Sequence, residues 1–400
     1  MGPIRADNRG KDQSSGVARA LAVWRYRVLA VVAGAIPALA FPAPSVALFG
    51  VVGLVPLMLL VFSAGSARDA IWRVWLGGVG YFIAVHHWLI PVTGPFVVPL
   101  ASLLAALWIP WGWLGWRILG QRRSIPRLVA ALVIVPSAWV AAEYVRAWGQ
   151  LGGPWGLLGA TQWANRPLLG VVSIGGVWLL SYVLVAVNVA ITSLLAPAAS
   201  PRERVVAASV GAGLLLAAVA VPSMLPFSES GVFRVAGVQP GIVHGGAERI
   251  AAHMELTRSL IGEDLDLIVW AESSVGVDLA PGDPRTDQLA DLSRAVDAPI
   301  LLNIDARAVD GGIYKASMLV APDGIRDRYD KMRLVPFGEY VPLRPVLGWV
   351  TRVTDAAYED RRRGEELVVM QVGDVAVGPL VCFESAFPDL SRSLVDRGAD

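Results

Sequence analysis

The chain has 400 residues, of which 55% are apolar and only 17% are charged, a balance that is unusual for a soluble globular protein. Its net charge of +1 argues against a nucleic-acid partner. A single cysteine excludes an internal disulfide framework and a cysteine-rich metal site. The four histidines show no metal-ligand spacing, so we expect neither a metal nor another cofactor.

The charged residues are distributed very unevenly along the chain. Residues 28–67 and 74–116 contain no Asp, Glu, Lys or Arg, whereas residues 228–400 carry charges at the density of a soluble protein. About 20 apolar residues span a bilayer as a helix. We therefore expect a basic cytoplasmic tail over residues 1–27, a multi-span α-helical membrane domain over 28–226 and a folded domain outside the lipid over 228–400. The expected transmembrane helices number about seven, at residues 28–43, 46–64, 74–93, 96–116, 128–147, 168–195 and 205–226.

The basic residues between these spans predict the orientation. One set of alternate connections, with the N-terminal tail, holds fourteen Arg and Lys, whereas the other set holds only Arg146 and Arg166. Short cytoplasmic loops are enriched in Arg and Lys, so the fourteen are expected in the cytoplasm. An odd number of spans then places residues 228–400 on the extracytoplasmic side.

The loop from Glu143 to Trp155 is too long and too rich in glycine to be a simple connection. It holds a carboxylate and a guanidinium near the membrane surface, where charges are costly unless they are paired or used. Two interpretations of Arg146 remain open: an ion pair with Glu143, or contact with a lipid headgroup, to which Trp155 would also contribute. Most other tryptophans near span ends fit the aromatic belt at the lipid–water boundary.

The second half alternates strand-like and helical patterns, typical of a layered α/β domain. Strands are predicted near 233–239, 265–271, 298–305, 314–320 and 325–329, with helices over 247–262, 286–296 and 388–397. A hairpin, 367–372 with 375–381, is expected to turn on Gly373 and Asp374. Catalytic groups often lie where such strands end, because a rigid sheet can position them there.

Three such positions carry residues suited to acyl transfer. A free thiol is mostly protonated at neutral pH, so Cys382 needs a base to remove its proton or a cation to stabilise its thiolate. Glu272 can supply the base, and the Lys331 ammonium can stabilise a thiolate or the oxyanion of a tetrahedral intermediate. The helix after Cys382 is expected to lower the thiol pKa through its dipole. Taken singly, each residue also has an ordinary explanation: a buried small cysteine, a capping or surface acid, and a solvated lysine.

The segments around these residues closely resemble the three catalytic segments of the apolipoprotein N-acyltransferases, the integral-membrane branch of the nitrilase (carbon–nitrogen hydrolase) superfamily. The matching motifs are Trp-Ala-Glu-Ser ending at Ser273, Arg-Tyr-Asp-Lys-Met-Arg-Leu-Val-Pro-Phe-Gly-Glu-Tyr-Val-Pro-Leu from Arg328, and Val-Cys-Phe-Glu ending at Glu384. The multi-span half and the Gly-Pro-Trp loop are also similar. The resemblance covers essentially the whole chain.

The resemblance implies an αββα nitrilase-like domain and names its site. Glu272 would be the general base, Lys331 the stabiliser of the tetrahedral intermediate and Cys382 the nucleophile. Glu339 and Glu384 match supporting acids, and Phe383 stands where the family usually has tyrosine.

The implied reaction is ping-pong. An acyl chain passes from a phospholipid to the cysteine as a thioester, and then to the amine of diacylglyceryl-cysteine on an apolipoprotein, in the bacterial inner membrane. The family's domain continues beyond the position of Asp400, so the resemblance implies a sequence truncated before the C-terminal part of that domain.

Two other interpretations remain. A membrane-anchored amidase of the nitrilase type would use water as the acceptor, and it would share the same three catalytic residues. A receptor or transporter is the non-enzymatic alternative, but the charge-free spans argue against transport, which needs polar groups inside the membrane.

Overall fold

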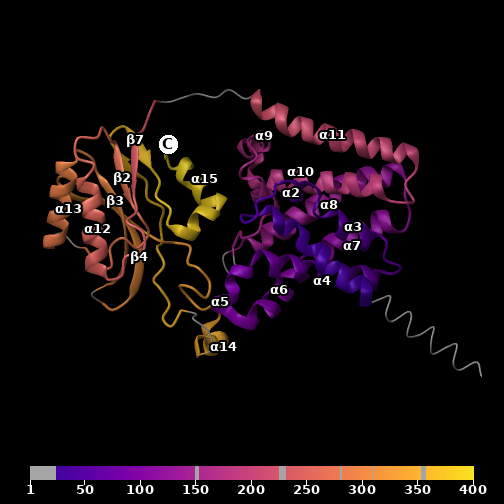
Figure 1. Cartoon of the computed structure of the whole chain (residues 1–400), viewed down its shortest axis with the longest axis horizontal. Helices are drawn as coiled ribbons and strands as arrows, with labels where there is room; N and C mark the ends of the chain where they lie inside the picture. Colours follow the sequence, from indigo (N-terminus) through magenta and orange to yellow (C-terminus); the bar gives the residue numbers. More distant parts are fainter. Residues whose placement is uncertain (1–23, 149–152, 225–230, 280–281, 309, 353–356) are drawn as a thin grey trace, which may run out of the picture. The chain divides into compact units, whose positions relative to one another are not determined.

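The computed structural model of the chain describes residues 24–148, 153–224, 231–279, 282–308, 310–352 and 357–400. The chain separates into two compact units. One comprises Met1–Trp148 and Pro154–Pro226, and the other comprises Gly149–Gly153 and Phe227–Asp400 (Figure 1). Most of the expected basic tail, residues 1–23, and part of the expected Glu143–Trp155 loop, residues 149–152, lie outside the described residues.

Within the described residues, the first unit is helical. Its long helices are α4 (Ala67–Val85), α8 (Ile125–Arg146), α10 (Val172–Leu195) and α11 (Pro201–Ser223). A helical run over residues 24–35 precedes them. The shorter helices are η1 (Ile36–Ala40), α2 (Leu48–Val52), α3 (Val55–Phe62), η2 (His87–Leu89), α5 (Ile90–Thr93), η3 (Gly94–Phe96), α6 (Val97–Ala106), α7 (Ile109–Gly115), η4 (Trp116–Gly120), η6 (Leu158–Gln162) and α9 (Arg166–Leu169).

Three of the described helices, α8, α10 and α11, are long and apolar enough to cross a bilayer. The bent pair Gly94–Ala106 and Ile109–Gly120 makes a fourth if it forms one span. The first unit therefore has the apolar helices of a membrane domain. The count of seven spans and the orientation of the chain stay predictions.

Polar side chains inside this unit hold irregular segments in place. The Asn188 side chain on α10 accepts a hydrogen bond from the Leu54 N–H at 3.0 Å and donates one to the Gly50 carbonyl at 3.1 Å. These bonds satisfy backbone groups where α2 gives way to α3, which is necessary because an unpaired buried polar group is costly.

The charged pair of the Glu143–Trp155 loop is buried and binds backbone groups. Glu143 accepts a hydrogen bond from the Leu158 N–H at 2.7 Å, and Arg146 donates to the carbonyls of Trp155 and Gly156. Both side chains thus secure the segment that follows the loop. This arrangement gives the two charges an internal role, and a lipid-headgroup contact stays a prediction.

The second unit is built on a five-stranded mixed sheet in the order β1-β2-β3-β4-β5. β1 (Val235–Val238), β2 (Leu267–Trp270) and β3 (Ile300–Arg307) are parallel, and β4 (Ile313–Ala321) and β5 (Gly324–Asp330) continue the sheet antiparallel. Helices α12 (Gly246–Arg258) and α13 (Pro284–Ala295) provide the crossovers that parallel strands require. This is the α/β domain expected from the alternating pattern.

The sheet buries a different core on each face because side chains alternate along a strand. On one face, even-numbered residues of β3 and β4 such as Ile300 and Met318 pack with Met254 of α12 and Leu289 of α13. On the opposite face, odd-numbered residues such as Leu319 pack with the C-terminal segment of the chain. Figure 1 shows α12 and α13 on one side of the sheet and α15 on the other.

The C-terminal segment is less regular than the sheet. It contains α14 (Arg344–Leu347), η7 (Gly348–Arg352), the hairpin of β6 (Met370–Val372) and β7 (Val375–Val377), then η8 (Cys382–Ala386) and α15 (Pro388–Asp396). The hairpin turns at the expected Gly373-Asp374, but its second strand ends four residues earlier than predicted. Pro379 lacks the N–H that a continuing ladder would need.

Candidate active site

Polar side chains occupy the odd-numbered face of β3 and β4. Asn303 and Asp305 lie on β3, and Lys315 and Ser317 lie on β4; the antiparallel register pairs Asp305 with Lys315 and Asn303 with Ser317. Since Leu301 and Leu319 of these strands pack in the core on the same face, the four polar residues face the side of the sheet that the C-terminal segment covers.

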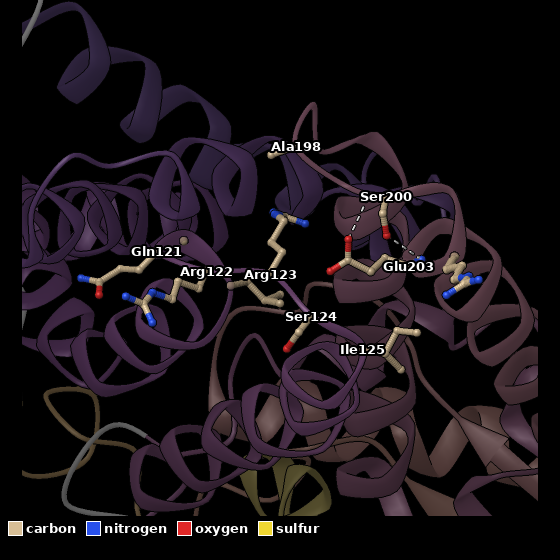
Figure 2. Close-up of a pocket in the computed structure, with 11 residues that line it drawn as sticks. Gln121, Arg122, Arg123, Ser124, Ile125, Ala198, Ser200 and Glu203 are labelled. Carbon is tan, nitrogen blue, oxygen red and sulfur yellow. Dashed lines mark hydrogen bonds between the residues drawn. The ribbon is translucent and has the colours of Figure 1, made fainter.

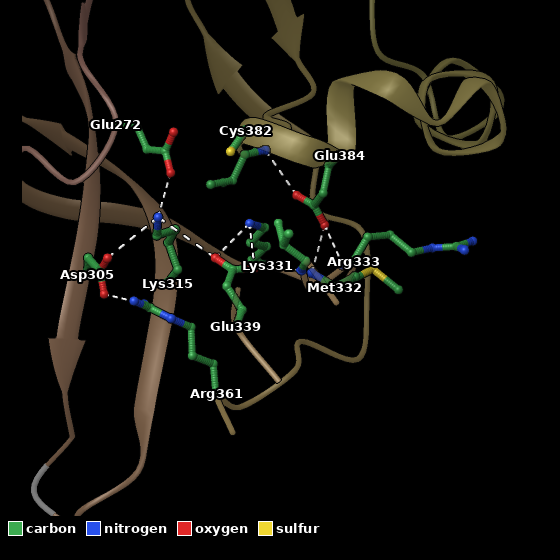
Figure 3. Close-up of polar contacts among 12 residues, drawn as sticks. Glu272, Asp305, Lys315, Lys331, Met332, Arg333, Glu339, Arg361, Cys382 and Glu384 are labelled. Carbon is green, nitrogen blue, oxygen red and sulfur yellow. Dashed lines mark hydrogen bonds and ion pairs between the residues drawn. The ribbon is translucent and has the colours of Figure 1, made fainter. Parts of the chain in front are cut away.

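Glu272 follows the end of β2 and is held from two directions. The next residue, Ser273, has a φ of +54°, and its N–H donates to the Asn303 side-chain oxygen at 2.8 Å. The Glu272 carboxylate itself accepts a hydrogen bond from the Lys315 ammonium at 2.5 Å (Figure 3). The carboxylate is therefore fixed to β4 as well as to its own strand.

Lys331 lies directly after β5 and is completely buried. Its ammonium donates to both oxygens of the Glu339 carboxylate, at 2.9 and 2.8 Å (Figure 3). Glu339 also accepts the Val335 N–H at 2.9 Å, so the turn between the two residues is closed on itself. A buried ammonium is tolerated only with such a partner, because isolated buried charges are strongly disfavoured.

Cys382 begins η8, and its backbone has a φ of +55°, a conformation that non-glycine residues rarely adopt. Its neighbour Phe383 is buried against Phe387, with ring centroids 4.8 Å apart. The carboxylate of Glu384 is fully buried and anchors the segment. It accepts hydrogen bonds from the Tyr329 hydroxyl and from the backbone N–H groups of Val381, Met332 and Arg333, at 2.7 to 2.9 Å.

The Cys382 thiol and the Glu272 carboxylate lie close enough to influence each other's pKa. Burial and the charge of Glu272 raise the pKa of the thiol, and the charge of Lys331 only partly offsets them. The net shift of this pKa is upward. It does not isolate the dipole of the following helix, so the lowering expected from that dipole stays a prediction. Burial alone would raise the pKa of Glu272, but the hydrogen bond and charge of Lys315, together with smaller contributions that include the charge of Lys331, lower that pKa.

A cavity of about 420 Å³ lies beside these two groups. Glu272 and Cys382 form part of its wall, and most of the remaining lining is apolar, including Phe233, Val269 and Leu380. A second cavity, of about 490 Å³, lies in the helical unit between the segment that precedes α8 and the start of α11 (Figure 2). Arg122, Arg123 and Arg202 line it together with Ser200 and Glu203, which cap the start of α11.

The predicted site residues therefore lie together in the second unit. Glu272 and Cys382 line the same cavity, the charge of Lys331 acts on both, Glu339 holds Lys331, and Glu384 holds the segment of Cys382. Three further charged residues were not predicted. Lys315 binds Glu272, Asp305 lies 3.5 Å from Lys315, and Arg361 forms an ion pair with Asp305. Lys315 could have been recognised in the sequence as a charged residue within the apolar run that forms β4.

The two halves of the chain match two family models. Residues 234–400 match the carbon–nitrogen hydrolase family, which agrees with a thiol, a carboxylate and a lysine gathered on a mixed sheet. This half is a carbon–nitrogen hydrolase domain. Residues 33–190 match the N-terminal domain of apolipoprotein N-acyltransferase.

Similar proteins carry the same name over nearly the whole chain. The apolipoprotein N-acyltransferase of Geobacter metallireducens is 30% identical over 403 residues, covering 94% of this chain and 76% of that protein. That of Pseudomonas aeruginosa is 30% identical over 400 residues, covering 93% and 76%. The chain belongs to the apolipoprotein N-acyltransferase family, as the sequence motifs predicted. It is a membrane-associated acyltransferase of lipoprotein maturation. This family membership excludes the interpretation of the chain as a receptor or transporter.

Proposed function

We propose that the enzyme transfers an acyl chain from a membrane phospholipid to an apolipoprotein by a ping-pong mechanism with a thioester on Cys382. The observation that carries this proposal is the placement of Cys382 and Glu272 in the wall of one cavity, in a chain of this family. Lys331 contributes a positive charge close to both groups.

At rest, the proposed site holds a neutral thiol and an ionised carboxylate. The raised pKa of Cys382 and the lowered pKa of Glu272 both favour this distribution of the proton. The thiol then loses its proton to Glu272 only as it attacks, which is general-base catalysis rather than attack by a preformed thiolate.

In the first half-reaction, the Cys382 sulfur bonds to the ester carbonyl carbon of the phospholipid, and its proton passes to Glu272. The tetrahedral oxyanion is stabilised by the Lys331 ammonium. The carbon–oxygen bond of the ester then breaks, the lysophospholipid oxygen takes the proton from Glu272, and the thioester remains. The apolar walls of the adjoining cavity are compatible with an acyl chain.

In the second half-reaction, the α-amine of the diacylglyceryl-cysteine attacks the thioester carbonyl. Glu272 accepts a proton from the amine and returns it to the departing sulfur, so the N-acylated lipoprotein leaves and the free thiol is restored. Glu339 and Glu384 support the reaction by holding Lys331 and the Cys382 segment, and the Phe383 ring packs behind the nucleophile. Because both substrates are anchored in the membrane, we place this site at the outer surface of the inner membrane, where confinement favours their encounter.

The thioester is the intermediate to test. Purified enzyme is incubated with a phospholipid of defined acyl chains and no acceptor, and intact-protein mass spectrometry follows the adduct. We expect one acyl mass on Cys382, released by neutral hydroxylamine and transferred when a diacylated lipopeptide with a free amine is added.

Variants separate the proposed roles. Cys382→Ala should form no adduct, and Glu272→Gln should form it slowly because the proton has no acceptor. Lys331→Met should acylate roughly a hundredfold more slowly or worse, as expected for the loss of an oxyanion donor. Acyl transfer by Cys382→Ala would overturn the mechanism. Free hydrolysis of the donor without transfer to the lipopeptide would instead favour the amidase with water as acceptor.

A further inference from the structure

Lys315 is the residue of the candidate site that binds Glu272 directly, and the proposed mechanism assigns it no role. Its ammonium is 2.5 Å from the Glu272 carboxylate, and its side chain is only 7% exposed. Lys331 is the lysine expected from the family resemblance, but its hydrogen bonds go to Glu339. The two lysines therefore donate their hydrogen bonds to different carboxylates.

The position of Lys315 is set by the sheet rather than by a flexible loop. It lies near the start of β4, directly opposite Asp305 of β3 in the antiparallel register. Asp305 is 3.5 Å from the Lys315 ammonium and is held from its other side by Arg361. A lysine restrained in this way has little freedom to leave Glu272.

The charges around Lys315 form a balanced group. Its ammonium faces Glu272 from the end of β2, Asp305 from β3 and, at 3.8 Å, Glu339 from the turn after β5. Three carboxylates thus meet three cations in this part of the described structure: Lys315, Lys331 and Arg361. Removing Lys315 would leave Glu272 without its hydrogen-bonded cation in a partly buried setting, which strongly disfavours the ionised form.

We propose that Lys315 is a positioning residue that holds Glu272, as an ionised base, against the Cys382 thiol. This inference rests on the proposed function, because it assumes that Glu272 is the base. The burial of Glu272 favours its protonated form, and the hydrogen bond and charge of Lys315 oppose that effect. Without Lys315, Glu272 would carry a proton at pH values where the wild-type residue is free to accept one.

The test is the pH dependence of a single acylation turnover in the purified enzyme, measured from pH 4.5 to 8.5 with a phospholipid donor. In Lys315→Met, the acidic limb should move to higher pH. The rate of each enzyme at pH 5.5 is divided by its own rate at pH 8. We expect this ratio to be roughly tenfold smaller in Lys315→Met than in the wild type, because the ionised fraction of a base falls tenfold for each pH unit below its pKa. A purely structural lysine would lower the rate equally at every pH.

Two further variants complete the design. Lys315→Arg keeps the charge and should retain the wild-type limb. Arg328→Met removes a cation from the neighbouring strand β5, where Arg328 pairs with Asp330, and should leave the limb unchanged. If Lys315→Met does not fold, Lys315→Gln, which keeps an N–H donor without the charge, serves the same purpose.

The outcomes also separate this inference from the proposed function. A wild-type pH profile in Lys315→Met, with Glu272→Gln inactive, would overturn the role of Lys315 and leave the mechanism standing. Full acylation by Glu272→Gln would overturn the mechanism itself, and the inference with it.

Discussion

At the scale of single residues, the backbone is strained where the site is built. Ser273, Phe337 and Cys382 all have φ values between +54° and +62°, and each lies at or within two residues of a proposed site residue. Such conformations persist only when surrounding contacts enforce them. Here the contacts are visible: Asn303 binds the Ser273 N–H, and Glu384 anchors the turn of Cys382.

Glu384 gives the first prediction, because its buried carboxylate accepts four hydrogen bonds that connect the Cys382 segment to the end of β5. Glu384→Ala would leave three backbone N–H groups without a partner. Each unsatisfied buried group costs about 1–3 kcal/mol, so we expect a loss of at least about 3 kcal/mol in the free energy of unfolding. Chemical denaturation in detergent measures it.

Glu366→Ala is the matched control, because Glu366 is exposed and precedes the same hairpin. Its effect should stay within about 0.5 kcal/mol of the wild type. If Glu384→Ala were as stable as this control, the four hydrogen bonds would not anchor the segment.

At the scale of elements, periodicity in the sequence predicted most of the strands and helices of the second unit. Strands β1 to β5 fall inside or within two residues of the predicted runs. Short apolar runs and period-two alternation are typical of strands, whose side chains point alternately to the two faces of a sheet. The register in which these strands pair could not be predicted from the sequence. Nothing in the sequence indicates that Asp305 lies opposite Lys315, and that pairing is what carries the second lysine to Glu272.

Some of the proposed site residues could be predicted from the sequence, and others could not. Glu272, Lys331 and Cys382 were found because each lies in a distinctive motif. Lys315, Asp305 and Arg361 lie in no such motif, and they come together only through the pairing of strands and the path of a long segment. Arg361 is the clearest case, since it reaches β3 from 56 residues away along the chain.

The link between that segment and β3 leads to a prediction about pH. Burial alone would raise the pKa of Asp305, but the hydrogen bond from Arg361 and the charges of Lys315 and Arg361 outweigh it and lower that pKa. A depressed carboxyl pKa stabilises the fold above the unfolded-state pKa of about 3.9, and this stability is lost as the pH falls through the folded value. Arg361→Met should therefore unfold more easily than the wild type at pH 7, and the difference should shrink as the pH falls below about 4.

Thermal unfolding at several pH values measures this difference. Arg362→Met is a suitable control, because Arg362 pairs with the exposed Asp310 and should contribute little at any pH. A deficit in Arg361→Met that stays the same from pH 7 to well below pH 4, where Asp305 is protonated in both states, would show that the arginine acts through packing rather than through Asp305.

At the scale of the whole molecule, composition divides the chain as the two units do. The charge-free stretches lie in the helical unit, and the charged half forms the carbon–nitrogen hydrolase domain. The number of spans was harder to predict, because an apolar run of a given length can form one straight helix or several short ones. Residues 46–64 illustrate this, since they form α2 and α3 with a break at Gly53 and Leu54 rather than one helix.

The last prediction concerns sidedness, which the distribution of arginine between the connections indicates. The variant Asp374→Cys in a Cys382→Ala background carries a single cysteine, in the exposed turn between β6 and β7. This cysteine should react with a membrane-impermeant maleimide in intact spheroplasts. The variant Arg122→Cys in the same background carries its single cysteine at an exposed position between η4 and α8, and it should react only after the membrane is permeabilised. The pair controls for reactivity, because each site serves as the other's reference before and after permeabilisation. The opposite pattern would place the carbon–nitrogen hydrolase domain in the cytoplasm, and it would also remove the proposed site from the outer surface of the membrane.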